Sequence, residues 1–552
     1  MEKTMIKNKL QQYKILLILL ILVAVSLIVF LNQIIYAWLI VEIYAFLLCG
    51  YLVIFDQREA TSKIAWILAL LFLPIVGIIL YYLIGREPRL RKLPKQQVAN
   101  ERNVQQTVSK ILQEHSEIIH AKHDLSNEIF HLSEKYPTKD NQLTLLKEGD
   151  EAFTALLQDI KQATHHIHLF YYIVKGDETG EELTAALIEK ARQGIEVRFM
   201  YDSVGSIAFP NRLLDALREN GVEVRTYDLL NSPWLSNKAN WRNHRKIVVI
   251  DGKIAHTGGM NIGNEYSGRG NKFSYWRDTN VRIEGPSVLE VQECFVYDWL
   301  FLDEGTETIS DFIKHQAVYF PLKTDTPKGS EIVQVIYGGP YDQERIIKDS
   351  FNDLIGKAVD SIKIAMPYFI PDEETLGALR RAARCGIKVQ LIIPGKGDRG
   401  ISFHGTNSFI DDLLSAGVEV SIYDTTAFIH CKYMIVDDVV ATIGSTNFDI
   451  RSFYLNHELS MFIYGPSRTI DELNDHFAED LAHAKRVKKR RMATAKWMDE
   501  SQRKNQWFIC PDSLIVENKR IVKAIVSLRQ SRQNDFLVLS TLFFILCFLI
   551  VL

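Results

Sequence analysis

The sequence predicts an α/β protein in which one domain of strands and helices occurs twice, behind N-terminal transmembrane helices. Three observations lead to this fold class. From about residue 141, short apolar strands alternate with amphipathic helices. The same order of segments returns from about residue 350, at a spacing near 190 residues, which indicates a duplicated domain rather than a solenoid repeat. The N-terminal stretch 1–85 is mostly apolar.

Length and charge narrow the class of protein. The chain has 552 residues, which suggests two to four domains. Its formal net charge is −3, unlike the strongly basic balance of many nucleic-acid binders, so no nucleic-acid partner is expected. Six cysteines include no CxxC pair, and neither a zinc site nor a redox site is predicted.

Three apolar stretches make residues 1–86 a predicted membrane anchor of two or three transmembrane helices. Residues 15–31 carry no charge, and residues 34–55 carry Glu42 as their only charged residue. Residues 64–84 contain a proline and a glycine, which membrane helices tolerate. A signal peptide is disfavoured because no A-x-A-like cleavage site follows and further apolar sequence does. The expected location is a membrane, with several passes.

The orientation of the anchor stays open in the sequence. Lysines precede the first apolar stretch, and basic residues follow the third. Both groups favour the cytoplasmic side, yet three full spans would put them on opposite sides. Either one stretch does not span, or the charge rule is violated.

A polar connector is expected over residues 87–140. It contains a helical stripe of apolar residues, at Val104, Val108, Ile111, Leu112 and Ile118. The stripe favours either a segment at the membrane surface or a solvated amphipathic helix.

Each copy of the repeat is expected to supply strands and helices in one order. In the first copy, strands are predicted over 166–174, 195–201 and 222–227, and helices over 181–193 and 211–220. In the second copy, strands are predicted over 361–370, 387–393 and 418–423, and helices over 373–384 and 409–416. This alternation is typical of βαβ units, so a mixed, mainly parallel sheet flanked by helices is expected in each domain.

The two domains are predicted over 141–327 and 328–484. A basic segment and an apolar tail occupy 485–552. The dense basic run 485–491 is either a solvated helix end or a segment attracted to anionic headgroups, at roughly 1 kcal/mol per basic residue near the surface. The C-terminal stretch 536–552 is apolar enough to enter a bilayer.

One short motif occurs once in each copy, on an apolar strand. His and Lys are two residues apart, Asp follows Lys by five, and Asn follows Asp by ten, after a pair of small residues. The motif residues are His244, Lys246, Asp251 and Asn261, and then His430, Lys432, Asp437 and Asn447. Two copies in register are unlikely to arise by chance.

The motif suits chemistry on a phosphate group. Side chains two apart on a strand share a face, so each His and Lys point the same way. Lysine offers a point charge to phosphate oxygens, and asparagine offers an amide donor. One histidine can attack phosphorus, and the other can move a proton to or from the alcohol oxygen. Because the lysines supply the positive charge, no metal or cofactor is expected.

Other acidic residues and histidines receive supporting roles. Asp278 follows the first motif and Glu458 follows the second, and both are candidates to orient the histidines. Asp251 and Asp437 end the motif strands, so we expect them to hold loop backbone, with contact to the lysines left open. His256 is expected to be a core histidine.

The doubled HxKx4D pattern, followed by x6-G-[GS]-x-N, resembles the phospholipase D superfamily. The stretch from Ala65-Trp66 to Gly85-Arg86 and the stretch Gly444-Ser-Thr-Asn-Phe-Asp-Ile-Arg-Ser452 with Asn456 and Glu458 resemble bacterial cardiolipin synthases more specifically. The resemblance covers about residues 40–485. It implies duplicated phospholipase D-like domains in a bacterial cell-membrane protein.

The resemblance also implies a reaction, in which a phosphatidyl group passes from one phosphatidylglycerol to a second and glycerol is released. The implied catalytic set is the His, Lys and Asp of both motifs, with Asn261 and Asn447 binding the substrate phosphate. His244 is the implied nucleophile and His430 the implied acid and base, although the residues alone would allow the reverse. The expected partner is anionic phospholipid; protein partners are not predicted.

Two other classes of function fit the same fold, a hydrolase and a non-catalytic lipid-binding protein. A phospholipase D-type hydrolase or a nuclease would form the same phospho-histidine and pass it to water. Membrane anchoring and the lack of a long basic, aromatic-rich groove disfavour a nuclease. A non-catalytic lipid-binding scaffold is disfavoured by two intact motifs.

Overall fold

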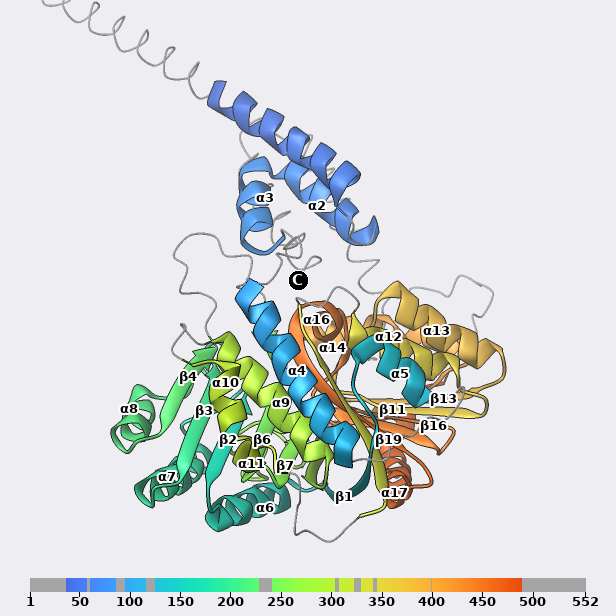
Figure 1. The fold of residues 1–552 in the computed structure, drawn as a ribbon. Coiled ribbons are helices and arrows are strands. Elements are labelled where there is room, and N and C mark those ends of the chain that lie inside the picture. The colour runs from blue at the N-terminus through green and yellow to red at the C-terminus, as the bar shows by residue number, and fades with distance from the viewer. Residues whose placement is uncertain are drawn as a thin grey trace, which may run out of the picture. The chain divides into compact units, whose positions relative to one another are not determined.

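The computed structural model describes residues 36–56, 60–85, 95–115, 125–227, 241–302, 307–321, 329–340, 345–398 and 400–488 (Figure 1). The described residues up to 85 belong to one compact unit, and those from 95 onward belong to a second one that contains both repeats. We refer to these as the N-terminal unit and the catalytic unit. The apolar stretch 15–31 and the C-terminal tail lie outside the described residues.

The N-terminal unit contains the helix Tyr36–Phe55, the helix α2 (Ala60–Phe72) and the helix α3 (Pro74–Leu80), which runs on into the π-helix η1 (Tyr81–Gly85). Within the described residues, Tyr36–Phe55 is the one helix long and apolar enough to cross a membrane. The predicted span 64–84 is divided at Leu73, because Pro74 cannot continue the hydrogen bonding of the helix before it.

Small and aromatic side chains pack the helices of the N-terminal unit together. Leu52, Trp66, Leu70 and Tyr81 are buried in one cluster. A Cβ on Gly77 would lie 2.6 Å from the carbonyl oxygen of Ala69, so the close approach of α3 to α2 requires glycine.

The catalytic unit is organised around one mixed sheet, which holds 16 of the strands among the described residues. In the first half the strands are β1 (Thr138–Leu146), β2 (His166–Tyr171), β3 (Glu196–Asp202), β4 (Glu223–Tyr227), β5 (Arg242–Asn243), β6 (Lys246–Ile250), β7 (Ile254–Gly258), β8 (Trp276–Arg277) and β9 (Asn280–Glu284). In the second half they are β10 (Glu331–Gly338), β11 (Ser361–Ala365), β12 (Phe369–Ile370), β13 (Lys388–Ile393), β14 (Glu419–Tyr423), β15 (Phe428–Ile429), β16 (Tyr433–Val436), β17 (Val440–Gly444), β18 (Phe448–Asp449), β19 (Asn456–Tyr464) and β20 (Ala484–Arg486). The order β20-β14-β13-β11-β16-β17-β19-β10-β1-β9-β7-β6-β2-β3-β4 is continuous across both halves, and β5 pairs with β19.

The expected mainly parallel pairing is wrong for this sheet. Only β2-β3-β4 and β11-β13-β14 form parallel runs within the order above. The motif strands β6 and β16 pair antiparallel on both sides. Three-residue turns join β6 to β7 and β16 to β17, and so short a connection can join only antiparallel strands.

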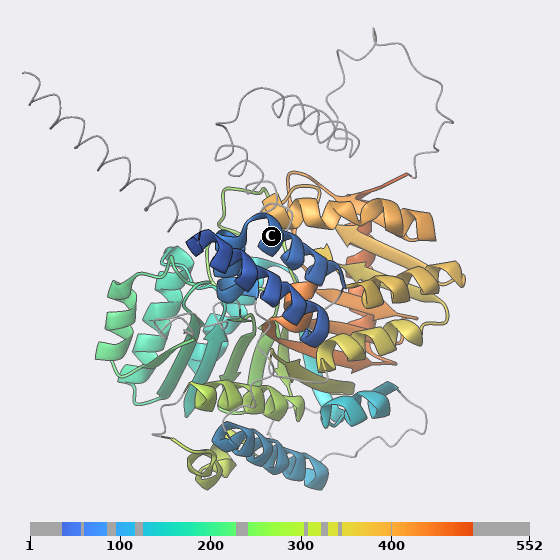
Figure 2. The same ribbon diagram turned by 90° about the horizontal axis from the view of Figure 1, so that it is seen from above.

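Helices flank the sheet, and Figure 2 shows helices from the first half at one end of it and helices from the second half at the other. The helices of the first half are α6 (Gly149–Gln162), α7 (Glu178–Arg192), α8 (Asn211–Glu219), α9 (Ser287–Phe301), α10 (Ile309–Lys314) and α11 (Gln316–Tyr319). Those of the second half are α12 (Ile346–Gly356), α13 (Glu373–Arg384), α14 (Gly400–Ser408), α15 (Ile410–Ala416), α16 (Ile450–Tyr454) and α17 (Arg468–Ala482). Residues of α9 and α17 belong to one hydrophobic core with strands from both halves, so the two repeats share their interior.

The expected connector contains two packed helices, α4 (Lys95–His115) and α5 (Leu125–Ser133). The stripe of Val104, Val108, Ile111 and Leu112 on α4 is buried in the same core as α9. This stripe is therefore neither solvated nor at a membrane surface; Ile118 lies outside the described residues. Helix α5 joins the core of the second half.

The start of the basic run is also ordered. β20 pairs antiparallel with β14 and forms the edge of the sheet. The run therefore begins as an edge strand rather than as a helix end, and its remainder from 489 onward lies outside the described residues.

Candidate active site

The two motifs meet because each half pairs with a short strand of the other. β5, just before His244, pairs in parallel with the start of β19. β15, just before His430, pairs in parallel with β8. Since β19 carries Glu458 and β8 precedes Asp278, each histidine is brought to the carboxylate of the opposite half.

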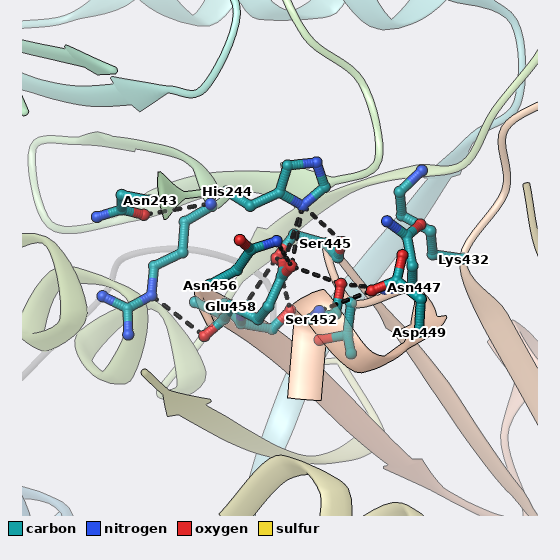
Figure 3. Close-up of polar contacts among 12 residues, drawn as sticks. Asn243, His244, Lys432, Ser445, Asn447, Asp449, Ser452, Asn456 and Glu458 are labelled. Atoms are coloured by element: carbon teal, nitrogen blue, oxygen red, sulfur yellow. Dashed lines mark hydrogen bonds and ion pairs between the residues drawn. The ribbon is translucent and has the colours of Figure 1, made fainter. Parts of the chain in front are cut away.

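His244 is held by the second half (Figure 3). Its Nδ1 lies 3.1 Å from the carboxylate of Glu458 and 3.1 Å from the carbonyl oxygen of Ser445. Its backbone N–H donates to the carbonyl of His457 at 2.9 Å. With Nδ1 engaged, Nε2 is the nitrogen left for chemistry.

His430 is held by the first half in the same way. Its Nδ1 lies 2.7 Å from Oδ2 of Asp278, and its backbone N–H donates to the carbonyl of Arg277 at 2.7 Å. Sequence order alone did not indicate this crossed arrangement, in which the carboxylate after one motif contacts the histidine of the other.

The Glu458 carboxylate accepts three further hydrogen bonds. Ser445 Oγ donates at 2.5 Å, Ser452 Oγ at 2.8 Å and Asn456 Nδ2 at 3.2 Å. These residues carry no role in the sequence prediction, although all three lie within the stretch that resembles cardiolipin synthases. They restrict the carboxylate to one position under His244.

The first half uses a glycine where the second has Ser445. A Cβ on Gly259 would lie 2.1 Å from Oδ1 of Asp278, so this position must be free of a side chain for Asp278 to reach His430. Asp278 Oδ1 accepts instead from the backbone N–H of Thr279 at 2.8 Å.

The motif lysines are buried beside the histidines. Lys246 Nζ donates to the carbonyl of His244 at 2.5 Å, and Lys432 Nζ donates to that of His430 at 2.6 Å. Burial, together with the positive charge of Lys432, lowers the pKa of Lys246 to about 7. Burial also lowers the pKa of Lys432. Two ammonium groups in one buried site favour an anion between them.

The two asparagines differ in their contacts. Asn261 Oδ1 accepts from the backbone N–H of Ile173 at 3.1 Å, which fixes the orientation of its amide. Asn447 Oδ1 is buried and has no hydrogen-bond partner among the described residues. Figure 3 shows the Asn447 side chain next to Lys432.

Electrostatics keep both histidines neutral at pH 7 in the free site. Burial and the two lysine charges lower the pKa of His244 to about 4, against the opposing effect of Glu458. Burial and Lys432 lower the pKa of His430 as well. Burial would raise the pKa of Glu458 and Asp278, but the adjacent histidines and lysines lower both. The site thus combines neutral imidazoles with ionised carboxylates.

The motif aspartates lie at the far ends of the motif strands. Asp251 accepts from the backbone N–H groups of Thr164, His165 and His166 at 2.8–3.0 Å. Asp437 accepts likewise from residues 359, 360 and 361 at 2.8–2.9 Å. Five residues along a strand separate each from its lysine, so they hold backbone and do not contact the lysines. These contacts are the ones expected if both aspartates support the loop backbone, while their place in the predicted catalytic set stays a prediction.

Buried arginines, which no sequence pattern indicated, hold the backbone of the orienting carboxylates. Arg245 Nε donates to the carbonyl of Glu458 at 3.1 Å, and its guanidinium pairs with Asp298 of α9 at 2.5 Å. Arg277 pairs with Asp480 of α17 at 2.9 Å and donates to the carbonyl of the residue that follows it. One helix of each half thus neutralises an arginine beneath the site. The expected core histidine, His256, lies outside the site, bonded to Asp159 at 2.7 Å.

A family model described as "Cardiolipin synthase, PLD-like domain" matches residues 156–299 and 351–481. A second, described as "Phospholipase_D-nuclease N-terminal", matches residues 34–86. The first model therefore matches both halves of the catalytic unit, and the second covers the described N-terminal unit.

Curated relatives agree with this assignment. Cardiolipin synthase 1 of Bacillus anthracis is 39% identical over 448 residues, which cover 80% of this chain and 86% of the relative. The major cardiolipin synthase ClsA of Bacillus subtilis is 38% identical over 446 residues, covering 79% and 90%. A solved structure of phosphatidylserine synthase from Haemophilus influenzae aligns with a TM-score of 0.52 at 16% identity, covering 66% of this chain and 92% of that one, and supports the fold. The chain belongs to the bacterial cardiolipin synthases of the phospholipase D superfamily.

Proposed function

We propose that this cardiolipin synthase moves a phosphatidyl group from one phosphatidylglycerol to a hydroxyl of a second, giving cardiolipin and glycerol. The observation that carries the proposal is the pair of neutral, buried histidines, each oriented by the carboxylate of the opposite half, with a lysine beside each. The two lysines would hold a phosphodiester anion, with one histidine attacking phosphorus and the other moving the proton of the alcohol.

In the first step, His244 Nε2 attacks phosphorus and the bond from phosphorus to the glycerol oxygen breaks. His430 is protonated when the phosphodiester anion binds, and gives its proton to that oxygen, so glycerol leaves as a neutral alcohol. In the second step, a hydroxyl of the second phosphatidylglycerol gives its proton to His430 and attacks phosphorus. The bond between phosphorus and Nε2 breaks, and His244 is restored.

His244 suits the nucleophilic role because its pKa is about 4, which leaves the Nε2 lone pair available at pH 7. Lys246, Lys432, Asn261 and Asn447 would hold the phosphate oxygens. His430 suits the role of acid and base because its short contact with Asp278 stabilises the imidazolium that must form.

The proposed enzyme is a multi-pass membrane protein with its anchor in residues 1–86. The helix Tyr36–Phe55 provides one pass. The apolar stretch 64–84 is the proposed source of a second pass, on the basis of its composition. Domains over 141–327 and 328–484 remain the proposed halves of the catalytic unit.

The test is a product analysis with the full chain in phosphatidylglycerol vesicles. Cardiolipin and glycerol in equal amounts are expected. Phosphatidic acid without cardiolipin would show the alternative hydrolase, because water would then resolve the phospho-histidine. No product from protein that is folded and inserted would support the non-catalytic scaffold.

A further inference from the structure

Exposed apolar side chains lie near the candidate active site in both halves of the catalytic unit. Val204 and Ile207 are exposed in the first half, and Ile207 is 87% exposed. Ile450 is exposed in the second half. Single exposed apolar residues are ordinary on protein surfaces, so their position must carry the argument.

The first-half pair lies on a loop fixed to the site. The loop follows β3, whose end lies at the same end of the sheet as Lys246. Ser206 Oγ donates to the carbonyl of Tyr172 at 3.1 Å, and the Tyr172 ring lies 4.8 Å from that of His244. Ser206, which lies between Val204 and Ile207, therefore connects this loop to the proposed nucleophile through Tyr172.

The second-half residue is fixed in the same manner. Ile450 is the first residue of α16, whose N-cap Asp449 accepts from the backbone N–H of Ser452 at 2.7 Å. Ser452 also bonds Glu458, and Asn447 lies three residues before Ile450 (Figure 3). The exposed Arg451 follows directly.

The site itself is recessed, since His244 is only 9% exposed and His430 only 5%. A diacyl lipid keeps its chains in the bilayer, so its phosphate reaches these histidines only if the mouth of the site meets the bilayer surface. Apolar side chains at that mouth gain by entering the boundary between headgroups and acyl chains, and an adjacent arginine can stay among anionic headgroups.

We propose that Val204, Ile207 and Ile450 form a docking rim that enters the surface of an anionic phospholipid bilayer when the enzyme takes substrate. This rests on the proposed function, because it assumes that the substrate is a bilayer lipid. The rim is separate from the transmembrane anchor and acts by bringing the recessed phosphate site to the headgroups.

The chain provides its own control at the other end of the sheet. Val359, 80% exposed, and Val439, also exposed, lie beside Asp437, the residue that ends the second motif strand. They match the rim in exposure and in side-chain type. If exposure alone caused lipid contact, they would enter the bilayer equally.

Site-directed fluorescence tests the rim in the full chain reconstituted into phosphatidylglycerol vesicles. Single cysteines at 204, 207, 450, 359 and 439 are introduced into a Cys385→Ser background, because Cys385 is exposed. Each is labelled with the environment-sensitive dye NBD, and the signal of the labelled parent is subtracted. The rim labels should shift to the blue and be quenched by lipids with a spin label on the acyl chain, whereas labels at 359 and 439 should stay in water.

A second arm separates this proposal from the proposed function. The rim labels should report lipid contact in a His430→Ala enzyme as well, because docking precedes chemistry. Lipid contact without any cardiolipin from the unsubstituted enzyme would reject the function and keep the rim. Cardiolipin synthesis with the rim labels in water, or equal shifts at 359 and 439, would reject the rim and keep the function.

Kinetics give an independent readout. Ile207→Ser should lower turnover on vesicles by about tenfold, the size expected for losing one buried aliphatic side chain from the lipid contact. Turnover on short-chain phosphatidylglycerol dispersed as monomers should be unchanged, as should both activities in the Val359→Ser control. An equal loss on both substrates would contradict the docking role.

Discussion

At the scale of residues, the central feature is the exchange of carboxylates between the halves. Glu458 orients His244 and Asp278 orients His430, so each histidine depends on a side chain from the other half of the chain. The sequence identified all four residues, because each lies in or near a repeated motif. It could not pair them, because the pairing is set by β5 on β19 and β15 on β8, contacts between segments that lie far apart in the chain.

The proposed order of steps predicts different fates for the two histidine variants. His430→Ala should form enzyme with phosphorus-labelled lipid on His244 slowly, because the leaving glycerol oxygen lacks its acid, and should then retain it, because the acceptor alcohol lacks a base. His244→Ala should form no such species, since Nε2 of His244 is the proposed attacking atom. Denaturing gels after incubation with ³²P-labelled phosphatidylglycerol measure both. A labelled His244→Ala enzyme would reverse the assignment.

The crossed contacts between carboxylates and histidines predict which histidine each carboxylate affects. Glu458→Gln should lower the pKa of His244 further, because a negative charge beside the imidazolium is removed, and should leave His430 unchanged. Asp278→Asn should lower the pKa of His430 and leave that of His244 unchanged. NMR of ring-labelled histidines reads the two titrations separately.

Turnover should fall in both carboxylate variants by about 10²–10⁴-fold, the usual contribution of a positioned acid or base. Asp159→Asn, beside the remote His256, serves as the matched control and should keep near-normal turnover. A changed pKa of His244 in the Asp278→Asn enzyme would contradict the crossed pairing of carboxylates and histidines.

The pKa of Lys246 predicts an alkaline limit to activity. Above pH about 7, the free enzyme loses the ammonium charge that holds the substrate phosphate, so kcat/KM should fall as pH rises. Bound phosphate stabilises the Lys246 ammonium charge, so the alkaline fall of kcat should lie at a higher pH than the fall of kcat/KM. The arginine in Lys246→Arg cannot lose its charge in this range, so kcat/KM of this variant should not fall above pH about 7, whatever its absolute activity. If the alkaline fall persists in Lys246→Arg, another group causes it.

At the scale of elements, local pattern predicted the pieces better than their pairing. The predicted helix 373–384 matches α13, and the predicted helix 181–193 begins three residues earlier in the structure because Asp177 caps it at Gly180. The parallel pairing was wrong since the motif strands return through tight turns. The stripe of α4 was visible in the sequence, but its burial on α9 depends on a partner helix at the far end of the first repeat.

The motif aspartates are predicted to matter for stability more than for chemistry. Asp251 and Asp437 have φ of 53° and 54°, and each gathers three backbone N–H groups from the loop before the neighbouring strand. Asp251→Ala and Asp437→Ala should each lower the free energy of unfolding by about 1–3 kcal/mol, because those donors lose their acceptor and a left-handed conformation is left to alanine. Denaturant unfolding measures this.

Turnover per folded molecule should stay within a few-fold of the parent in both aspartate variants, since neither carboxylate reaches the lysines. Lys253→Ala, in the same turn as Asp251, controls for disturbance of the turn surface. Complete loss of turnover in a variant that unfolds like the parent would return these aspartates to the catalytic set.

At the scale of the molecule, the two repeats form one body. β1 of the first half pairs with β10 of the second, and β10 pairs with β19, so the sheet crosses the boundary without a gap. The core around α9 includes Phe295 and Val281 from the first half and Val335 and Met461 from the second. The duplication was evident from repeated sequence, but this fusion was not, because strand edges that meet across a boundary carry no local pattern of their own.

Fusion of the halves predicts how a divided enzyme behaves. If the chain is cut between residues 327 and 328, the first fragment keeps His244 without Glu458, and the second keeps His430 without Asp278. Neither fragment should make cardiolipin. Co-expressed fragments should regain activity, because β1 and β10 pair along their facing edges and the two halves share one hydrophobic core. Cardiolipin content of a synthase-deficient host measures each case, and a co-expressed pair with Glu458→Gln controls for activity that does not require the exchanged carboxylate. Synthesis by one fragment alone would mean that a single half, or two copies of it, can complete the site, and the crossed pairs would then not be essential.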